Sequence, residues 1–213
     1  MLEVYEDYLD LIETEAIKDG IGDFRMAREE FHNLAGKFED GEPWFELRMN
    51  MFLDWCLLDR SGPDDMTPVA RFLTMKGNVL DAEEKAQMEY LTVTLRSVFR
   101  LIEAKGDNLR LEDLARGGEW LVHSTLPTVG LSSRDILDAR IVFFGGRPTI
   151  GRGIVLHPRE AHEAIDEIIA RAKTEHLPPA TLVNHLDKMR LKLDRYSSVH
   201  IKHVYKYPGD AIL

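Results

Sequence analysis

The chain has almost no cysteine and no long apolar run, and both absences limit what it can be. Its 213 residues include one cysteine, Cys56, which excludes an intrachain disulfide and a structural zinc site built from several cysteines. Cys56 stands within the apolar segment 52–58, so we expect a buried hydrophobic side chain rather than a nucleophile. The longest apolar runs, such as residues 141–144, are far shorter than the roughly 20 residues that span a bilayer.

The first residues also lack the features of a secretory signal. Residues 1–7 are acidic, whereas a signal peptide begins with a basic segment. Together with the low cysteine content, this predicts a cytoplasmic protein that does not enter a membrane.

Positive charge is scarce relative to negative charge. The chain has 37 acidic and 27 basic residues, a net charge of −10, which disfavours nucleic acid as a partner because phosphate backbones are repelled. Residues 1–43 contain 13 acidic and 4 basic side chains, whereas residues 172–213 contain 7 basic and 4 acidic ones. This asymmetry is compatible with contacts inside one molecule or with a surface that faces a partner.

No familiar catalytic, nucleotide or metal motif is present. The chain has no G-x-S-x-G segment. Residues 146–153 resemble a phosphate-binding loop, but Arg152 and Gly153 stand where Lys and Ser or Thr are needed, so we interpret the segment as a glycine-rich hairpin. His162 and Asp166 share a helix face near His157, which we interpret as a side-chain pair rather than a metal site. We therefore expect no cofactor.

Helical periodicity dominates the first part of the chain. Apolar residues recur at helical spacing in residues 4–17, 23–38, 44–59, 68–75 and 81–94. Asp81 followed by Glu84 predicts a capping box at the last of these helices. A phenylalanine recurs every seven residues from Phe24 to Phe52, but Gly41 and Pro43 interrupt a continuous coiled coil. We expect these rings to face one core, and a seam for a partner helix is the alternative.

Five short strands and two further helices are predicted after this region. The strands fall at residues 97–103, 109–112, 119–123, 136–144 and 149–156. Helical spacing returns in residues 157–172 and 182–193, and residues 199–207 are predicted to be an extra strand or an extended arm. The pattern predicts an α+β fold in which N- and C-terminal helices pack around a small five-stranded antiparallel meander or barrel.

The whole chain is expected to be one compact unit of residues 1–213. Within it, residues 1–95 are predicted to be helical, residues 96–157 to be antiparallel β, and residues 158–213 to be helical with a C-terminal arm. No internal repeat and no linker marks a boundary between independent domains.

The middle of the chain resembles a diffuse group of uncharacterised bacterial cytosolic proteins, some of which carry an appended SEC-C zinc motif. The resemblance covers residues 45–160 and rests on the segments at residues 52–55, 58–60, 67–68, 111–114 and 135–140. The zinc motif needs several cysteines, and this chain has only Cys56. The resemblance therefore implies a bacterial, cytosolic protein and supplies no activity.

The favoured function is a non-enzymatic interaction or regulatory role through protein–protein contacts or self-association. Basic and aromatic side chains alternate near the C-terminus and are the predicted partner-binding residues: His200, Lys202, His203, Tyr205, Lys206 and Tyr207. Such a segment can dock on an acidic partner or on the acidic N-terminal helices of a second copy. The same composition also suits an edge strand that is protected by lysines.

Two other functions remain open. One is an enzyme of unfamiliar type, with a pocket between helices and sheet that is lined by Asp54, Arg60, Arg140 and His123. A buried Asp54 needs a cationic partner, for which Arg48 or Arg140 is available. The other is a nucleic-acid-associated small barrel that uses the set Trp120, Arg147 and Arg152.

Overall fold

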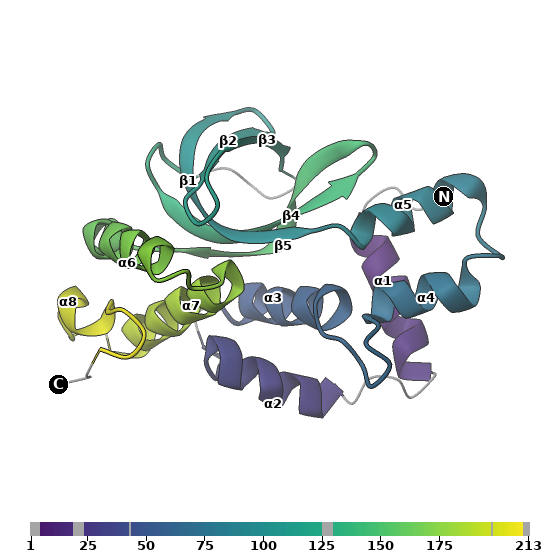
Figure 1. Ribbon diagram of the computed structural model, residues 1–213, viewed down its shortest axis with the longest axis horizontal. Coiled ribbons are helices and arrows are strands. Elements are labelled where there is room, and N and C mark those ends of the chain that lie inside the picture. The colour runs from purple at the N-terminus through teal and green to yellow at the C-terminus, as the bar shows by residue number, and fades with distance from the viewer. Residues whose placement is uncertain (1–4, 19–23, 43, 125–129, 197, 211–213) are drawn as a thin grey trace.

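The computed structural model describes residues 5–18, 24–42, 44–124, 130–196 and 198–210. This described part contains eight α-helices, one short 3₁₀ helix and a five-stranded mixed sheet, so the α+β prediction is confirmed. Helices cover one side of the sheet, and α3 runs directly beneath β4 and β5 (Figure 1). None of the described helices has the length and apolarity that crossing a membrane requires.

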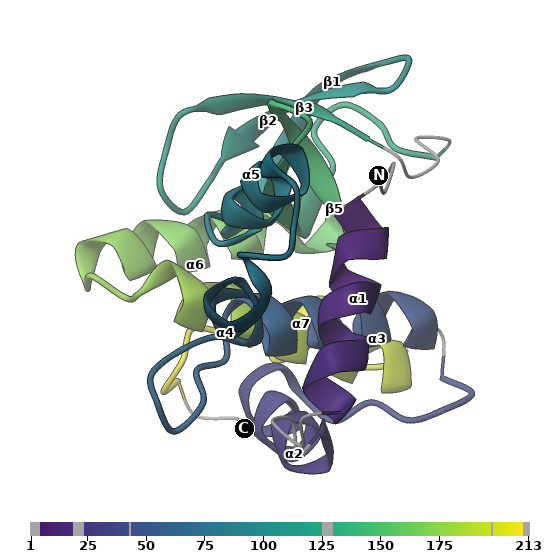
Figure 2. The same cartoon turned by 90° about the vertical axis from the view of Figure 1, so that its right-hand side faces the viewer.

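Five helices precede the sheet, close to the predicted positions. They are α1 (Tyr5–Lys18), α2 (Phe24–Ala35), α3 (Phe45–Leu58), α4 (Pro68–Lys76) and α5 (Ala82–Leu91). The predicted capping box is confirmed, since the Asp81 carboxylate accepts from the backbone N–H of Glu84 and the Glu84 carboxylate accepts from that of Asp81. Helices α1, α4 and α5 lie at one end of the molecule (Figure 1), the end that faces the viewer in Figure 2, and they share a hydrophobic cluster.

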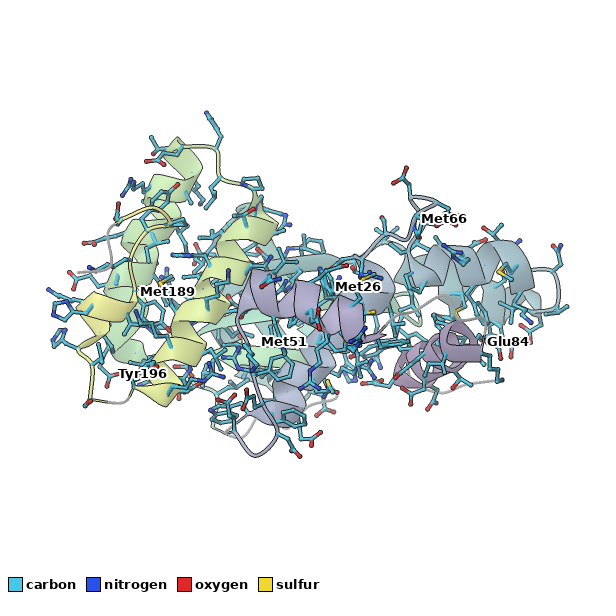
Figure 3. All side chains as sticks on the ribbon, turned by 90° about the horizontal axis from the view of Figure 1, so that it is seen from below. Met26, Met51, Met66, Glu84, Met189 and Tyr196 are labelled. Carbon is cyan, nitrogen blue, oxygen red and sulfur yellow. The ribbon has the colours of Figure 1, made fainter. Side chains whose placement is uncertain are left out.

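The phenylalanines of the seven-residue repeat meet in one core, as predicted. Phe31, Phe38 and Phe52 are buried in a single cluster with Cys56, and Phe24 and Phe45 pack against it. The view from the helical side (Figure 3) shows α2, which carries Met26, lying over the part of α3 that carries Met51. The repeat therefore joins α2, α3 and the connection between them.

The sheet differs from the predicted antiparallel arrangement at one position. Its strands are β1 (Leu95–Lys105), β2 (Asn108–Asp113), β3 (Glu119–His123), β4 (Ile136–Phe144) and β5 (Arg147–Leu156). Their order is β1-β2-β3-β5-β4, and β4 pairs again with β1, so the order closes on itself. The link between β3 and β5 is parallel and joins His123 to Thr149. Because both edges of β4 are occupied by β1 and β5, β3 can pair only with β5, which runs in the same direction.

Strand β4 separates the interior of the sheet from the helical layer. Leu137, Ala139 and Ile141 pack inside the sheet, and the period of two residues turns Asp138 and Arg140 toward the helices. Both polar side chains are buried, with Asp138 0% exposed. The register of β4 thus delivers charged groups to the boundary between sheet and helices, where they need partners.

The C-terminal segment is helical and packed, not an extra strand or an extended arm as predicted. After the 3₁₀ turn Arg159–Ala161 come α6 (His162–Thr174), α7 (Pro179–Arg195) and α8 (Ile201–Val204). Val204, Tyr205 and Tyr207 are buried in the same cluster as the apolar stripes of α6 and α7. The reason is burial of apolar surface, because a free arm would leave two tyrosine rings in water.

Candidate ligand-binding site

A cavity of about 370 Å³ lies where the start of α3 meets the ends of β5 and α7. This volume falls in the range of small-molecule sites, roughly 300–1,000 Å³. The charged residues in its lining are Arg48, Arg190 and Asp194, and the apolar walls are formed mainly by Trp44, Leu47, Leu131, Ile154, Leu156 and Pro158. Apolar walls with a few converging polar groups are typical of ligand sites.

Gly153 allows α3 to approach β5 closely enough to form one wall of the cavity. A Cβ at Gly153 would lie 2.7 Å from the backbone nitrogen and 2.5 Å from Cγ of Met51. Any larger residue would therefore push the helix away from the strand. The close contact fixes the helical turn before Met51, which carries Arg48, beside the end of β5.

Trp44 stands at the mouth of the cavity with an unusual backbone conformation. It is the residue before α3, its φ is 66°, and the residue is 55% exposed. A bulky residue in the left-handed region costs on the order of 1–3 kcal/mol, and such strain often marks functional sites. This conformation helps to place the indole at the cavity mouth.

Arg48 is a buried cation without a hydrogen bond to any described side chain. The residue is 4% exposed, and its Nε has no hydrogen-bond partner. The nearest carboxylate oxygen, Oδ2 of Asp194, lies 3.9 Å from Nη2, which is beyond hydrogen-bonding distance. Burial lowers the pKa of Arg48, and the charges of Asp187 and Asp194 only partly oppose that shift. The guanidinium is therefore incompletely compensated.

The second cation of the cavity already has a partner. Nη1 of Arg190 lies 2.8 Å from Oδ1 of Asp194, one helical turn along α7. Oδ2 of Asp194 accepts no hydrogen bond in the described structure, and burial raises the pKa of this carboxyl. The lining thus holds two cations and one anion.

His157 lines the cavity but directs both ring nitrogens into the protein. Its Nδ1 lies 2.9 Å from the hydroxyl of Tyr205, and its Nε2 lies 3.0 Å from Oδ2 of Asp138. Burial lowers the pKa of His157 to about 3, so the ring is neutral. With Nε2–H donating to Asp138, Nδ1 accepts from Tyr205. The imidazole has no nitrogen left for a ligand.

Asp138 and Asp187 form a buried carboxyl pair behind His157. Both are 0% exposed, and each carboxyl affects the pKa of the other. Burial raises the pKa of each to about 7. No described N–H or O–H group reaches Oδ1 of either carboxyl, so one proton held between them satisfies both. Arg96 donates to Asp187 and, at 2.7 Å, to Oδ1 of Asn184.

The residues of the predicted partner-binding arm differ in exposure to solvent. His200, Lys202 and His203 are exposed, whereas Tyr205 and Tyr207 are buried and Lys206 is partly buried. Tyr205 bonds to His157, and the ring of Tyr207 lies 3.9 Å below the guanidinium carbon of Arg171.

The residues of the predicted enzyme pocket are only partly brought together. Asp54 and Arg140 share a hollow of about 10 Å³, too small for more than one water molecule. Arg60 instead bonds to Glu30 at 2.6 Å, and His123 lies on β3. The expected partner of Asp54 was Arg48 or Arg140; the partner that bonds to it, at 2.9 Å, is Arg152.

Arg152 is paired with carboxylates of the protein itself, so it is not available for the predicted nucleic-acid-binding set. Its Nη1 lies 3.4 Å from Asp10 in addition to the contact with Asp54. Trp120 packs edge-on against Phe143, and Arg147 is exposed.

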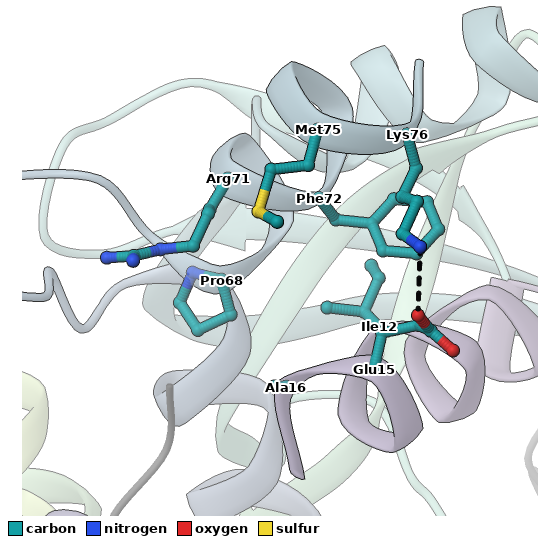
Figure 4. A pocket seen from close by; sticks show the side chains of 8 residues that line it. All are labelled: Ile12, Glu15, Ala16, Pro68, Arg71, Phe72, Met75 and Lys76. Carbon is teal, nitrogen blue, oxygen red and sulfur yellow. Dashed lines mark ion pairs between the residues drawn. The ribbon is translucent and has the colours of Figure 1, made fainter. Parts of the chain in front are cut away.

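Neither the groove between α1 and α4 nor the segment around His162 and Asp166 forms a ligand site. The groove between α1 and α4, which contains an ion pair between Glu15 and Lys76, encloses about 20 Å³ (Figure 4). That is room for about one water molecule. Within the described ranges no three His, Cys, Asp or Glu side chains are placed to hold a metal ion. Asp166, expected beside His162, instead bonds to Arg100 at 2.5 Å.

Comparisons of the chain with protein-family models, curated proteins and solved structures found no match. The resemblance to bacterial cytosolic proteins consequently stays a prediction, and the cavity must be interpreted from its own chemistry.

Sequence reasoning missed this cavity as a site. The sequence pattern indicates Arg48 only as a partner for Asp54 and gives no signal for Asp187 or Arg190. A signal was present, because Arg48 interrupts the most apolar helix and Asp138 interrupts an apolar strand. Charged residues at such positions are buried and therefore need partners, but the sequence does not show which side chains meet.

Proposed function

We propose that the protein binds a small organic anion in the cavity between α3, β5 and α7. The observation that carries this proposal is Arg48, a buried guanidinium that faces the cavity with no hydrogen bond to a described side chain. Removing a cation from water is costly unless it is paired and hydrogen-bonded. An anion in the cavity supplies the missing acceptors, and the walls bury the rest of the molecule.

Binding is a better description of this site than catalysis. Asp194, which lines the cavity, is paired with Arg190. The titratable groups behind it face one another: His157 bonds to Asp138 and Tyr205, and Asp187 bonds to Arg96. A general acid or base must reach the substrate within hydrogen-bonding distance. In the present arrangement these groups support the wall and leave recognition to the arginines.

Anilinonaphthalene sulfonate is a suitable first probe, because it is an apolar organic anion whose fluorescence rises on burial. We expect the wild-type protein to bind it at one saturable site. Arg48→Met keeps the length of the side chain and removes the charge, so binding should weaken by roughly 10- to 100-fold, the loss of a charged hydrogen bond.

Arg71→Met is the matched control. It removes the same charge from α4, where Arg71 is paired with Asp64 and does not line the cavity. This variant should bind the probe as tightly as the wild type. Equal affinity of the Arg48→Met and wild-type proteins would contradict the proposal.

Docking of the C-terminal segment on a protein partner or a second copy stays a prediction. The structure narrows its basis to His200, Lys202 and His203, which are exposed on and beside α8. Tyr205 and Tyr207 support the core and do not offer a docking surface.

A further inference from the structure

The side chains that line the cavity carry one unit of net positive charge. Arg48 and Arg190 contribute two positive charges, and Asp194 contributes one negative charge. His157 contributes none, because its two nitrogens are engaged by Asp138 and Tyr205 as a neutral ring.

The layer behind the cavity does not remove this excess. Neither Asp138, Asp187 nor Arg96 lines the cavity, and Asp187 accepts from Arg96. Burial raises the pKa of both carboxyls to about 7, which favours one shared proton and a single negative charge beside Arg96. The unbalanced positive charge therefore belongs to the cavity itself. A ligand with one negative charge neutralises it, whereas a second negative charge would lie near Asp194 without a counter-charge.

The rest of the cavity is apolar and larger than a charged head group needs. Its volume of about 370 Å³ is room for roughly a dozen water molecules of about 30 Å³ each. Leu47, Ile154 and Leu156 line it from two elements, and Trp44 stands at the mouth. Acetate or inorganic phosphate would leave most of this surface uncovered.

On the basis of the proposed function, we infer that the ligand is a monocarboxylate with an apolar body. The carboxylate lies against Arg48, whose planar guanidinium matches two carboxylate oxygens, and Arg190 adds a second positive charge. The apolar body lies along Leu47, Ile154 and Leu156 toward the indole of Trp44, where burial of apolar surface adds affinity.

Isothermal titration of the whole protein with five probes tests this inference. Octanoate has one charge and an apolar chain, octanol has no charge, acetate has no chain, and suberate and octyl phosphate have an additional charge. Octanoate should bind tightest. Octanol should bind roughly 10- to 100-fold more weakly, because the guanidinium loses its anion. Acetate, suberate and octyl phosphate should each bind at least roughly tenfold more weakly than octanoate.

Asp194→Asn shifts the charge of the lining by one unit with little change of shape. In this variant the preference should move toward the doubly charged probes, so the ratio of suberate to octanoate affinity should rise by roughly tenfold. The comparison among wild-type titrations needs no variant and therefore stands even if Asp194→Asn folds poorly.

The outcomes separate this inference from the proposed function. If the naphthalene sulfonate depends on Arg48 but octanol or suberate equals octanoate, the cavity binds organic anions and the monocarboxylate assignment is wrong. If acetate equals octanoate, the apolar walls contribute nothing and the assignment is also wrong. If neither the sulfonate nor any of the five probes binds, the proposed function itself fails.

Discussion

Two arginines at the interface between helices and sheet, one buried and one partly buried, have opposite surroundings. Arg152, on β5, donates to Asp54 at 2.9 Å and approaches Asp10 at 3.4 Å, with only Nη2 left without a partner. Arg48, on α3, is more deeply buried and lies 3.9 Å from its nearest carboxylate. Burial acts to lower the pKa of both arginines. At Arg152 the charge and hydrogen bond of Asp54, together with Tyr5 and Asp10, outweigh burial and the pKa rises, whereas at Arg48 the pKa falls.

This difference separates a structural arginine from one that is available for recognition. Arg152 has two carboxylate partners within the chain, and the hollow beside Asp54 encloses almost no free volume. The Arg48 cluster borders a cavity and lacks one negative charge. A buried charge is compatible with a stable fold when its partner is present. A buried charge without a full partner lowers the free energy of unfolding. Ligand binding offers a reason for that cost.

The strongest test of this difference replaces each arginine by methionine in a separate variant. Arg152→Met leaves Asp54 buried without its partner, so the free energy of unfolding should fall by about 3–5 kcal/mol. Arg48→Met removes a poorly compensated charge and should change it by about 1 kcal/mol or less, or raise it. Denaturant unfolding at neutral pH measures both.

Equal destabilisation by the two substitutions would show that Arg48 is a structural residue like Arg152. Arg71→Met, which removes an arginine from an ion pair near the protein surface, provides the baseline for the loss of one charge and should stay within about 1 kcal/mol of the wild type.

Much of the fold follows from local sequence pattern. The helix after Asp81 begins at its capping box, and the spacing of Phe31, Phe38 and Phe52 correctly places them in one core. These predictions succeed because capping and amphipathic periodicity act over a few residues. The parallel contact of His123 with Thr149 could not be predicted in this way, since it depends on which strand edges are left after β4 has paired.

The candidate site depends on contacts that are remote in sequence. Arg48 faces Asp194, and His157 joins Asp138 to Tyr205. Each residue departs from the apolar pattern around it, which indicates a buried polar group but does not identify its partner. The same limitation explains the wrong prediction for the C-terminal segment, because alternating basic and aromatic residues do not reveal that Tyr205 bonds to a buried histidine.

The carboxyl pair behind the cavity permits a second test with two isosteric substitutions. Asp187→Asn removes the anion that Arg96 bonds to, so the free energy of unfolding should fall by about 1.5–3 kcal/mol. Asp138→Asn should change it by about 1 kcal/mol or less near neutral pH. The new amide can donate to Asp187 while its oxygen accepts from His157, so every polar group keeps a partner.

Thermal or denaturant unfolding of the two variants in one buffer measures this contrast. If Asp138→Asn is as damaging as Asp187→Asn, the two carboxyls do not share a proton, and the charge balance behind the cavity must be recounted. The result would then weaken the monocarboxylate assignment without affecting the comparison of Arg48 with Arg152.

The smallest expected effect is a pH dependence that only the shared proton produces. Burial raises the pKa of Asp138 and Asp187 to about 7, above the value of about 3.9 in an unfolded chain. The folded protein therefore holds a proton that the unfolded chain has released, and stability falls as pH rises through about 7. The lowered pKa of His157 acts in the opposite direction, but only below about pH 6.5, the unperturbed pKa of histidine.

The window from about pH 6.5 to 8.5 consequently isolates the carboxyl pair. Across it, the wild type should lose about 1 kcal/mol of unfolding free energy more than Asp138→Asn, in which no proton has to be held. Taking the difference between the two proteins cancels the contribution of the remaining histidines. Parallel curves for wild type and variant would mean that both carboxylates are ionised near neutral pH. Arg48 would then already have its compensating charge inside the protein, and the distinction from Arg152 would lose its basis.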